Sequence, residues 1–506
     1  MDYIIVQAGG KGTRLGYLTK NKPKALVPVD NLPMLFHLFR KFPDKRFVII
    51  ADYKKYVMRE YLAAFADVKY QIVEASGAGT CAGVKQAIDL IPEQCSFMLI
   101  WSDLILPDEF ELPNEFLNNE APANDYVGLS QTFPCRWKYE EDHFYEQRSK
   151  EYGVAGFFLF TEKSKIAEIP VNGEFVRWIS EQGIKFKTVG LGGTKEFGLL
   201  EEYEKLPQTK CRPFNRITIQ DNCFIKEPID DQGKKLAKRE TLWYEKARLL
   251  NIPELPKIYE IDPLKMEFIH GRNIYDCDFD HITKLSVLRS LISALKSLHE
   301  SKKINADTFS IEEAYYNKTL SRLDKIQDLV PYARDKEILI NGRKCRNVFY
   351  YKDELQRRIE KLKYNCKNFA FIHGDCTFSN LMVRENDRPV LIDPRGYFGF
   401  SELYGDVRYD WAKLYYSIVG NYDQFNLKRF KLDIGETAEE GVQLQIDSNH
   451  WEELEEEFFE LTGTDRYEIK LLHAVIWLSL TTYAWQDYDS ICGAFYNGLY
   501  YLEEVL

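Results

Sequence analysis

The sequence predicts an α/β protein in which a mostly parallel sheet is followed by a second, largely helical region. Up to about residue 205, short runs of β-branched or aromatic residues alternate with helical patterns, which favours parallel strands joined by helices. The stretch LPQTKCRPFNR (206–216) then breaks the alternation with two prolines, and we place a domain boundary there. A chain of 506 residues is long enough for about two to four domains.

The first region contains several runs that we interpret as strands, with helical patterns such as LPMLFHLFRKF (32–42) between them. These runs cover residues 3–8, 46–52, 69–75, 96–103, 126–133, 153–160 and 184–191. Ligands of such sheets bind at the carboxyl ends of the strands. A glycine-rich loop directly follows the first run, so the sequence places a candidate binding loop at this edge.

The second region begins with a hairpin pattern, RITIQDNCFIKEP (216–228), which we expect to turn at Asp221 and Asn222. A charged helix over 236–250 and a strand over 265–271 follow. From about residue 275 onward we expect a largely helical fold with a loop-rich insert near 371–400.

Two later segments of this region also read as helices. The charge run WEELEEEFFEL (451–461) predicts a solvated amphipathic helix. The apolar stretch LLHAVIWLSLTTYAW (471–485) contains His, Ser and Thr and is too short for a membrane span, so it predicts a buried helix.

The composition argues against several classes of protein. A formal net charge of −11 without a concentrated basic stretch argues against nucleic acid as a partner. The ten cysteines form no CxxC pair and no zinc-like spacing, which predicts reduced thiols. The chain starts with a strand-like DYIIVQA and no basic leader. We therefore expect a cytoplasmic protein without a membrane span.

The loop after the first strand has the composition of a phosphate-binding site. Its glycines let backbone N–H groups approach an anion closely, and a following helix adds its positive end. The pattern is neither a P-loop nor a dinucleotide fingerprint. Two cations, Arg14 and Lys24, flank the glycines, which suits a triphosphate that loses pyrophosphate. The candidate nucleotide-binding residues of the loop are Gly9, Gly10, Lys11, Gly12 and Thr13.

The segment AGGKGTRLGYLTKNKPKALVPV resembles the signature of the sugar-phosphate nucleotidyltransferase family, G-x-G-T-R followed by P-K-x-L-x-P-V. The resemblance covers about residues 1–205 and implies that Arg14 and Lys24 hold the NTP and stabilise the leaving pyrophosphate. It also implies that Gly79 and Thr80, in SGAGTCAGVKQA (76–87), approach the nucleotide base.

The same resemblance implies that Asp103, at the end of the strand-like IWSD, binds Mg²⁺. The family often carries a second metal-binding Asp before a Gly-Thr pair. In this chain GLGGTKEF (190–197) has no Asp in that place, and Glu196 is the remaining candidate.

A second group of residues, in FIHGDCTFSNLMV (371–383) and PVLIDPRGYFG (389–399), suits phosphoryl transfer. Asp375 can orient a hydroxyl and accept its proton, while Asn380 and Asp393 can hold Mg²⁺ on nucleotide phosphates. The D-x-x-x-x-N spacing is that of the protein-kinase catalytic loop. No glycine-rich loop precedes Lys226, however, and the metal motif is IDP rather than DFG.

These segments resemble the aminoglycoside phosphotransferase and choline kinase group over about residues 211–506. The resemblance implies that Asp375 is the catalytic base, and that Asn380 and Asp393 are metal ligands. It further implies that Lys226 reaches the α- and β-phosphates of ATP. Glu240 is the expected partner of that lysine, with Glu245 as the rival.

Other positions follow from the same resemblance. MEFIHG (266–271), with Glu267, fits the strand that meets the adenine. Asp410 in YDWAKL matches a helix-start Asp with a structural role, and we expect His373 to hold its loop rather than to shuttle protons.

Together the resemblances imply a Rossmann-like nucleotidyltransferase domain over 1–208 and a two-lobed α+β protein-kinase-like domain over 209–506. The N-lobe of the second domain is expected at about 209–272 and its helical C-lobe at about 273–506. One chain that carries both activities would phosphorylate a small alcohol with ATP. It would then use a second NTP (CTP, UTP or GTP) and Mg²⁺ to make a nucleoside-diphosphate conjugate for cell-surface glycan synthesis.

The identity of the alcohol stays open at this point, as does the oligomeric state. A sugar is the first choice, and choline or ethanolamine is the alternative. Arg395 would repel a cationic acceptor if it faced the pocket. Aromatic residues near the C-terminus could instead cage a quaternary ammonium or stack on a sugar, or simply form core. They are Trp411, Tyr415, Tyr416, Trp477, Tyr483, Trp485 and Tyr488. A third possibility is that one half is inactive and serves as a sensing or scaffold module.

Overall fold

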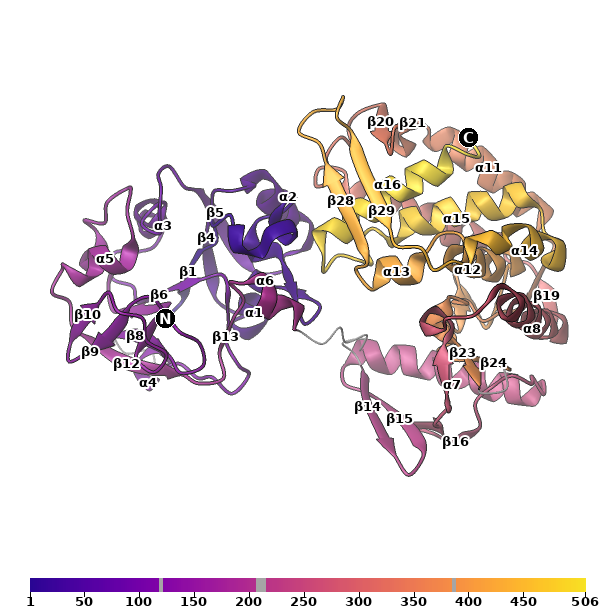
Figure 1. Cartoon of the computed structure of the whole chain (residues 1–506), viewed down its shortest axis with the longest axis horizontal. Coiled ribbons are helices and arrows are strands. Elements are labelled where there is room, and N and C mark those ends of the chain that lie inside the picture. The colour runs from indigo at the N-terminus through magenta and orange to yellow at the C-terminus, as the bar shows by residue number, and fades with distance from the viewer. Residues whose placement is uncertain (118–121, 206–214, 385–387) are drawn as a thin grey trace. The chain divides into compact units, whose positions relative to one another are not determined.

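The computed structural model describes residues 1–117, 122–205, 215–384 and 388–506. The chain divides into two units (Figure 1). The first comprises Met1–Pro207 and Trp485–Asp489, and the second comprises Gln208–Ala484 and Ser490–Leu506. The domain boundary predicted after residue 208 falls in 206–214, outside the described residues.

The first unit is built on a nine-stranded mixed sheet with strands in the order β10-β9-β11-β6-β1-β4-β5; in addition, β8 pairs with β11, and β12 pairs with β8. The strands β6, β1, β4 and β5 run parallel, whereas β11 is antiparallel to β6. The bounds are β1 (Tyr3–Gln7), β4 (Arg46–Ala51), β5 (Lys69–Glu74), β6 (Phe97–Trp101), β8 (Asp125–Ser130), β9 (Lys138–Glu140), β10 (His143–Tyr145), β11 (Gly153–Phe160) and β12 (Phe186–Leu191). The predicted α/β class with a parallel core is thus confirmed.

The register of the parallel strands brings their carboxyl ends level. Gln7 lies opposite both Ile50 and Trp101, the last or nearly the last residues of their strands. The loops that follow β1 and β6 therefore leave the sheet at the same edge. Strands β1, β4 and β6 consist largely of fully buried apolar residues, as expected for strands covered on both faces.

Helices and small ribbons complete the first unit. The helix α3 (Val84–Asp89) packs against β1 and β4. The other helices are α1 (Met34–Lys41), α2 (Lys55–Phe65), α4 (Asn114–Leu117), α5 (Phe175–Ser180) and α6 (Leu200–Glu204). Two short ribbons lie outside the main sheet: β2 (Pro28–Val29) with β3 (Leu32–Pro33), and β7 (Leu104–Ile105) with β13 (Lys195–Glu196).

The second unit begins with a four-stranded antiparallel sheet, ordered β14-β15-β17-β16, and the helix α7 packed on β15 (Figure 1). Its elements are β14 (Asn215–Gln220), β15 (Cys223–Pro228), α7 (Asp231–Leu249), β16 (Ile258–Ile261) and β17 (Leu264–Glu267). The hairpin turns at Asp221 and Asn222, which both have positive φ (51° and 60°), as a type I′ turn requires. The helix α7 starts earlier than predicted because the Asp230 side chain caps it by accepting from the N–H of Gly233.

The rest of the second unit is largely helical. Its helices are α8 (His281–Ser301), α9 (Thr308–Glu312), α10 (Lys318–Ile326), α11 (Lys352–Asn365), α12 (Val407–Ile418), α13 (Tyr422–Asn426), α14 (Glu455–Thr462), α15 (Arg466–Leu480) and α16 (Tyr488–Leu502). The loop-rich insert contains β22 (Asn368–Phe371), β23 (Leu381–Arg384) and β24 (Pro389–Leu391). The sheet of the N-lobe, α7, α8, α12 and α14 share one apolar core.

A four-stranded sheet in this region was missed by the sequence analysis. It has the order β21-β20-β29-β28, with β20 (Glu337–Ile340), β21 (Arg343–Arg346), β28 (Phe430–Ile434) and β29 (Val442–Ile446). Asn341 and Gly342 join β20 to β21 with positive φ at both positions (50° and 76°). An Asn-Gly pair is a strong short-range hairpin signal that the sequence analysis did not use, although the region is largely helical as predicted.

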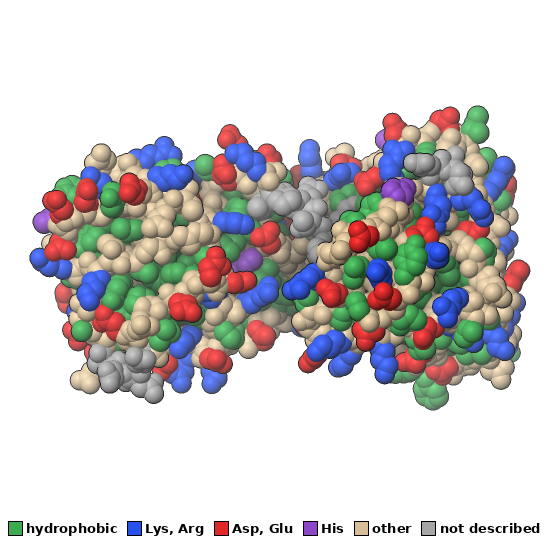
Figure 2. Space-filling model, turned by 90° about the horizontal axis from the view of Figure 1, so that it is seen from below, with side chains coloured by type: hydrophobic (Ala, Val, Ile, Leu, Met, Phe, Trp, Pro, Cys, Tyr) green, Lys and Arg blue, Asp and Glu red, His purple; other side chains and the backbone are tan. Residues whose placement is uncertain are grey.

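The charge run at 451–461 and the apolar stretch at 471–485 both form helices, but they are buried to different degrees. The charge run at 451–461 forms α14 preceded by a short 3₁₀ turn, and it buries Phe458 and Phe459. The apolar stretch at 471–485 lies mostly in α15, whose residues from Leu471 to Ser479 are all buried. Among the described residues, none of the helices has the length and apolar character needed to cross a bilayer. On the described part of the face drawn in Figure 2, acidic and basic side chains are interspersed in both units.

Candidate active sites

The glycine loop of the first unit lies at the carboxyl edge of the sheet, directly after β1. Gly12 has a φ of 67° and begins a 3₁₀ helix over Thr13–Thr19. A Cβ atom at position 12 would lie 3.0 Å from Cβ of Lys24. Glycine is therefore required both for the left-handed backbone and for the close approach to Lys24. Gly10, Lys11, Thr13 and Arg14 are exposed, and Nζ of Lys11 lies 5.3 Å from the ring centre of Tyr53.

Two cations and two carboxylates meet beside this loop. Nζ of Lys24 forms an ion pair with Oδ2 of Asp103, which follows β6. Glu196 pairs with Leu104 in the β7–β13 ribbon, so it stands next to Asp103 although it is distant in sequence. Burial and then the Asp103 carboxylate raise the pKa of Glu196, while Lys24 and Arg14 act in the opposite direction. The structure thus brings Arg14, Lys24, Asp103 and Glu196 together.

These two carboxylates form a donor set of the kind that Mg²⁺ uses, because Mg²⁺ is usually held by one or two carboxylates plus substrate phosphates. Because burial and Asp103 raise the pKa of Glu196, an additional positive charge nearby would stabilise its ionised form. In the described ranges no cluster of three or more His, Cys, Asp or Glu side chains could hold a metal ion. A metal at this site would therefore depend on the substrate phosphates for further ligands.

The loop expected near the nucleotide base is anchored to the same edge. Nε2 of Gln7, the last residue of β1, donates to the carbonyl oxygens of Thr80 (2.8 Å) and Ala82 (3.1 Å). Oγ1 of Thr80 accepts from the N–H of Phe175 at 2.8 Å. Gly79 has a φ of 85°, and a Cβ atom there would lie 2.3 Å from the carbonyl oxygen of Gly173. Gln7, which the sequence analysis did not single out, ties this loop to the strand that carries the glycine loop.

In the second unit, Lys226 lies between two carboxylates. Its Nζ is 2.8 Å from Oε2 of Glu240 on α7 and 2.6 Å from Oδ1 of Asp393, just beyond β24. Burial raises the pKa of Glu240 to about 7, against the effect of Lys226. Although burial opposes it, attraction to Asp393 and Glu240 raises the pKa of Lys226. Glu245 is exposed, so Glu240 is the residue that the structure pairs with the lysine.

Asp375 and Asn380 form a second contact at the same site. Nδ2 of Asn380 donates to Oδ2 of Asp375 at 2.9 Å and to its carbonyl oxygen at 3.0 Å. Nζ of Lys413, on α12, lies 3.0 Å from the other carboxylate oxygen, Oδ1 of Asp375. Asp393 has a φ of 51°, an uncommon backbone conformation that functional sites often contain.

The loop that carries Asp375 is held by buried polar groups. The carboxylate of Asp410 accepts from the N–H groups of His373 (2.9 Å) and Gly374 (2.7 Å), and lies 2.9 Å from Nε2 of His299. The ring of His373 is completely buried, with Nε2 2.9 Å from the carbonyl oxygen of Ile392. These contacts link the strands before Asp375 and Asp393. His373 and Asp410 therefore support the loop from beneath.

Glu267 is engaged in contacts within the lobe. Its carboxylate pairs with Arg384 at 2.5 Å and accepts from the N–H of Lys257 at 2.9 Å. The side chain of Glu267 is therefore engaged, and only its backbone groups at the end of β17 could contact a nucleotide.

Lys413 is the residue of the second site that the sequence analysis missed. A signal was present, because Lys413 follows Asp410 by three residues at the start of a predicted helix. Residues at that spacing share a helix face, so Asp410 and Lys413 are expected to face the same loop.

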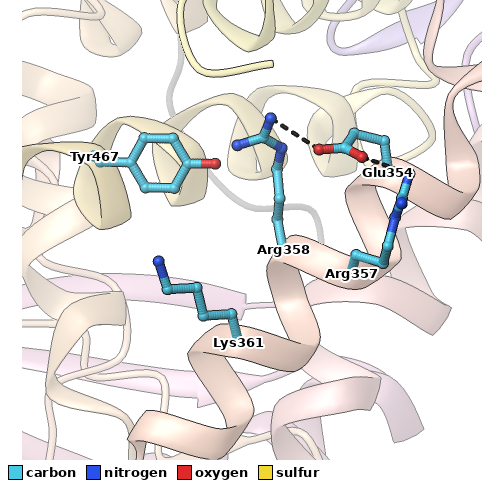
Figure 3. A pocket seen from close by; sticks show the side chains of 5 residues that line it. All are labelled: Glu354, Arg357, Arg358, Lys361 and Tyr467. Atoms are coloured by element: carbon cyan, nitrogen blue, oxygen red, sulfur yellow. Dashed lines mark ion pairs between the residues drawn. The ribbon is translucent and has the colours of Figure 1, made fainter.

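A surface pocket of about 470 Å³ lies elsewhere in the second unit (Figure 3). It is lined by Glu354, Arg357, Arg358, Lys361 and Tyr467. Glu354 pairs with Arg357 (2.6 Å) and Arg358 (2.8 Å), so much of the positive charge is already compensated. None of the candidate site residues lines this pocket. Its exposed cations therefore serve as controls in the experiments below.

Each candidate site thus combines cations and carboxylates at or near the ends of strands. Residues 3–141 match the family model "Nucleotidyl transferase", and residues 237–442 match the family model "Phosphotransferase enzyme family". The chain therefore carries a domain that matches the nucleotidyltransferase model, followed by a domain that matches the phosphotransferase enzyme family.

Individual relatives match the chain over limited lengths. The Bifunctional protein GlmU of Methanocaldococcus jannaschii is 34% identical over 184 residues, which is 33% of this chain and 43% of that protein. The glucose-1-phosphate cytidylyltransferase of Salmonella typhimurium is 36% identical over 77 residues, 14% of this chain and 30% of that protein. The chain thus spans less than half the length of these relatives. Among solved structures, HddC from Yersinia pseudotuberculosis is 19% identical with a TM-score of 0.34, covering 41% of this chain and 98% of that one.

Proposed function

We propose that the second unit transfers the γ-phosphoryl group of ATP to the hydroxyl of a small alcohol. The first unit then joins the new phosphate to the nucleotidyl group of a second NTP and releases pyrophosphate. The observation that carries this proposal is that one chain combines a nucleotidyltransferase domain with a phosphotransferase-family domain. The product of a phosphotransferase belongs to the substrate class of a nucleotidyltransferase.

In the phosphotransferase site, each side chain has a role that its position supports. Asp375 accepts the proton of the attacking hydroxyl, and Asn380 orients that carboxylate through its 2.9 Å hydrogen bond. Lys226, held by Glu240, binds the α- and β-phosphates of ATP. Asn380 and Asp393 would hold Mg²⁺, which when bound neutralises charge on the β- and γ-phosphates. The hydroxyl oxygen forms a bond to the γ-phosphorus as the bond from that phosphorus to ADP breaks.

In the nucleotidyltransferase site, an oxygen of the phosphomonoester attacks the α-phosphorus of the NTP. The bond between the α-phosphorus and the bridging oxygen breaks, and pyrophosphate leaves. Lys24 and Arg14 stabilise the negative charge that develops, and backbone N–H groups of the glycine loop bind the phosphates. Asp103 and Glu196 would hold Mg²⁺, which supplies further neutralisation when bound. No proton transfer is needed, because the attacking group is already an anion.

Similarity to a glucose-1-phosphate cytidylyltransferase supports a sugar phosphate as the substrate of the first unit. The base of the second NTP is left to experiment, with CTP, UTP and GTP as candidates. A sugar is therefore proposed over choline or ethanolamine.

The test is an incubation of the full chain with Mg²⁺, ATP and one of CTP, UTP or GTP. Separate pools contain sugars, sugar acids, and choline with ethanolamine, and mass spectrometry detects the conjugates. We expect a new nucleoside-diphosphate conjugate that disappears in Asp375→Asn and in Lys24→Gln. In the presence of the purified phosphomonoester, Asp375→Asn should regain the conjugate whereas Lys24→Gln should not.

Arg357→Gln is the matched control, because this arginine is 70% exposed and lies in the surface pocket away from both sites. Conjugate formation by Asp375→Asn without added phosphomonoester would refute the kinase assignment. Unchanged conjugate formation by Lys24→Gln would show that the first site is misassigned.

A further inference from the structure

Four cations of the phosphotransferase domain lie close enough to act on one another, and one of them contacts Asp375. Lys318 and Arg322 come from one face of α10, Arg395 from the loop after Asp393, and Lys413 from α12. We refer to these four residues as the cation cluster. Lys413 is the member that contacts Asp375, at 3.0 Å.

Arg395 and Arg322 have neutral partners within the described part of the chain. Arg395 donates to the hydroxyl groups of Tyr409 (2.7 Å) and Tyr397 (2.8 Å). Arg322 donates to the hydroxyl of Ser479 at 3.1 Å. For the ammonium group of Lys318, no hydrogen bond or ion pair occurs among the described residues. The carboxylates that act on the cluster from nearby are Asp375 and Glu313.

The mutual repulsion within the cluster is visible at Lys318. Burial lowers the pKa of Lys318, and Arg395, Arg322 and Lys413 lower it further, whereas Glu313 acts in the opposite direction. The half-buried ammonium group of Lys318 thus has too little negative charge around it to compensate for its cationic neighbours. A bound anion would supply that compensating charge.

A π-helical turn and two tyrosine rings shape the surroundings of the cluster. A π-helical turn over Glu313–Asn317 immediately precedes Lys318, and such turns often occur at functional sites. Arg395 also stacks on the rings of Tyr397 (4.4 Å) and Tyr409 (5.9 Å), and the latter ring lies 6.0 Å from Nζ of Lys413. Lys226, which belongs to the nucleotide, does not contact this group and is bound to Glu240 and Asp393 instead. The cluster is therefore separate from the contacts proposed for ATP.

We propose that the alcohol phosphorylated by the second unit carries an anionic oxygen group, a carboxylate or a phosphate, which Lys318, Arg322 and Arg395 bind. This inference rests on the proposed function and narrows its substrate class. A guanidinium binds such groups by paired hydrogen bonds, and Lys318 adds a point charge. The same cluster repels choline and ethanolamine. The aromatic residues that could have caged a quaternary ammonium are mostly core: Trp411, Tyr415, Tyr416, Trp477 and Tyr488 are buried.

The test measures transfer of labelled phosphate from γ-labelled ATP by the full chain to four separate pools of acceptors. Two pools are anionic: one holds sugar acids and hydroxy acids, and the other holds sugar phosphates. The third pool holds the matching neutral sugars and polyols, and the fourth holds choline with ethanolamine. We expect organic phosphate in one of the two anionic pools, and the pool identifies the group as carboxylate or phosphate. For the active acceptor, kcat/KM should exceed that of its neutral analogue by about tenfold or more, as expected for charged hydrogen bonds.

The variant Lys318→Gln/Arg322→Gln should raise KM for the acceptor by about tenfold or more while KM for ATP is unchanged, because the proposal assigns ATP to Lys226 and not to these residues. Arg357→Gln is the control for loss of an exposed cation. Basal ATP hydrolysis by the wild-type chain reports separately on the phosphotransferase site, and it should be lost in Asp393→Asn. If the wild-type chain hydrolysed no ATP, the proposed function would be refuted. Hydrolysis with transfer only to neutral or amino alcohols, or to no anionic acceptor, would overturn the anionic class.

Discussion

Nζ of Lys413 lies 3.0 Å from Oδ1 of Asp375, the carboxylate proposed as the catalytic base. Nδ2 of Asn380 binds the second oxygen of the same carboxylate at 2.9 Å. The two contacts fix the direction in which Asp375 can accept a proton. We therefore expect Lys413 to act as a positioning residue for this carboxylate.

Replacing Lys413 should therefore impair the chemical step rather than ATP binding. In Lys413→Met we expect kcat for phosphoryl transfer to fall by about tenfold to a hundredfold, a part of the general-base contribution. KM for ATP should stay the same, and Lys413→Arg should recover much of kcat because it keeps the charge. Steady-state kinetics at saturating Mg²⁺ measure both constants. An unchanged kcat in Lys413→Met would contradict the assigned role.

The buried carboxylate of Asp410 should be a large determinant of stability. Asp410→Ala leaves the N–H groups of His373 and Gly374 and the ring of His299 without a partner. We expect a loss of about 3–5 kcal/mol in the free energy of unfolding, as for one partner removed from a buried pair. Urea denaturation measures the change. Glu439→Ala, at an exposed position, is the control, and an equal effect of both substitutions would show that Asp410 does not hold the loop.

Glu196 should contribute to the Mg²⁺ dependence of nucleotidyl transfer. In Glu196→Gln we expect the half-saturating Mg²⁺ concentration to rise by about tenfold, because one charged donor is lost. Asp103→Asn should have a larger effect, since it also breaks the contact with Lys24. Rates of pyrophosphate release over a Mg²⁺ titration give both values. Glu201→Gln is an exposed control, and a Mg²⁺ curve for Glu196→Gln equal to that of the control would remove Glu196 from the site.

His473 should make the stability of the second unit depend on pH. Burial lowers the pKa of His473 from 6.5 to about 3, and Trp477 donates to its Nε2 at 3.0 Å. The unfolded chain therefore takes up a proton below pH 6.5 that the folded chain does not. The stabilisation is fully present above pH 6.5 and is lost as the pH falls toward 3, by about 1.4 kcal/mol per pH unit.

Urea denaturation between pH 7 and pH 4.5 tests this effect by comparing the wild-type chain with His473→Gln. The difference in the free energy of unfolding between the two should shrink steadily as the pH falls below 6.5. His270→Gln, an exposed histidine, should show no such trend relative to wild type. A difference between wild type and His473→Gln that stays constant over this range would refute the prediction.

Local patterns in the sequence were sufficient for many elements. The alternation of strands and helices predicted the parallel core, and Asp221 and Asn222 predicted the hairpin turn because they tolerate positive φ. The glycine loop was singled out by its glycines and flanking cations, and the D-x-x-x-x-N segment by its spacing; both stay predictions as binding sites. The Asn341–Gly342 hairpin shows that a local signal can also be missed.

The contacts that join distant segments were decided by tertiary structure. Glu240 and Glu245 are both on α7, and only the packing of that helix on β15 decides that Glu240 reaches Lys226. Glu196 stands beside Asp103 because a short ribbon pairs β13 with β7. The cation cluster likewise combines α10, α12 and the loop after Asp393. Spacing along the chain determines which residues share a face of one element, but the proximity of charges on different elements depends on how the core packs them.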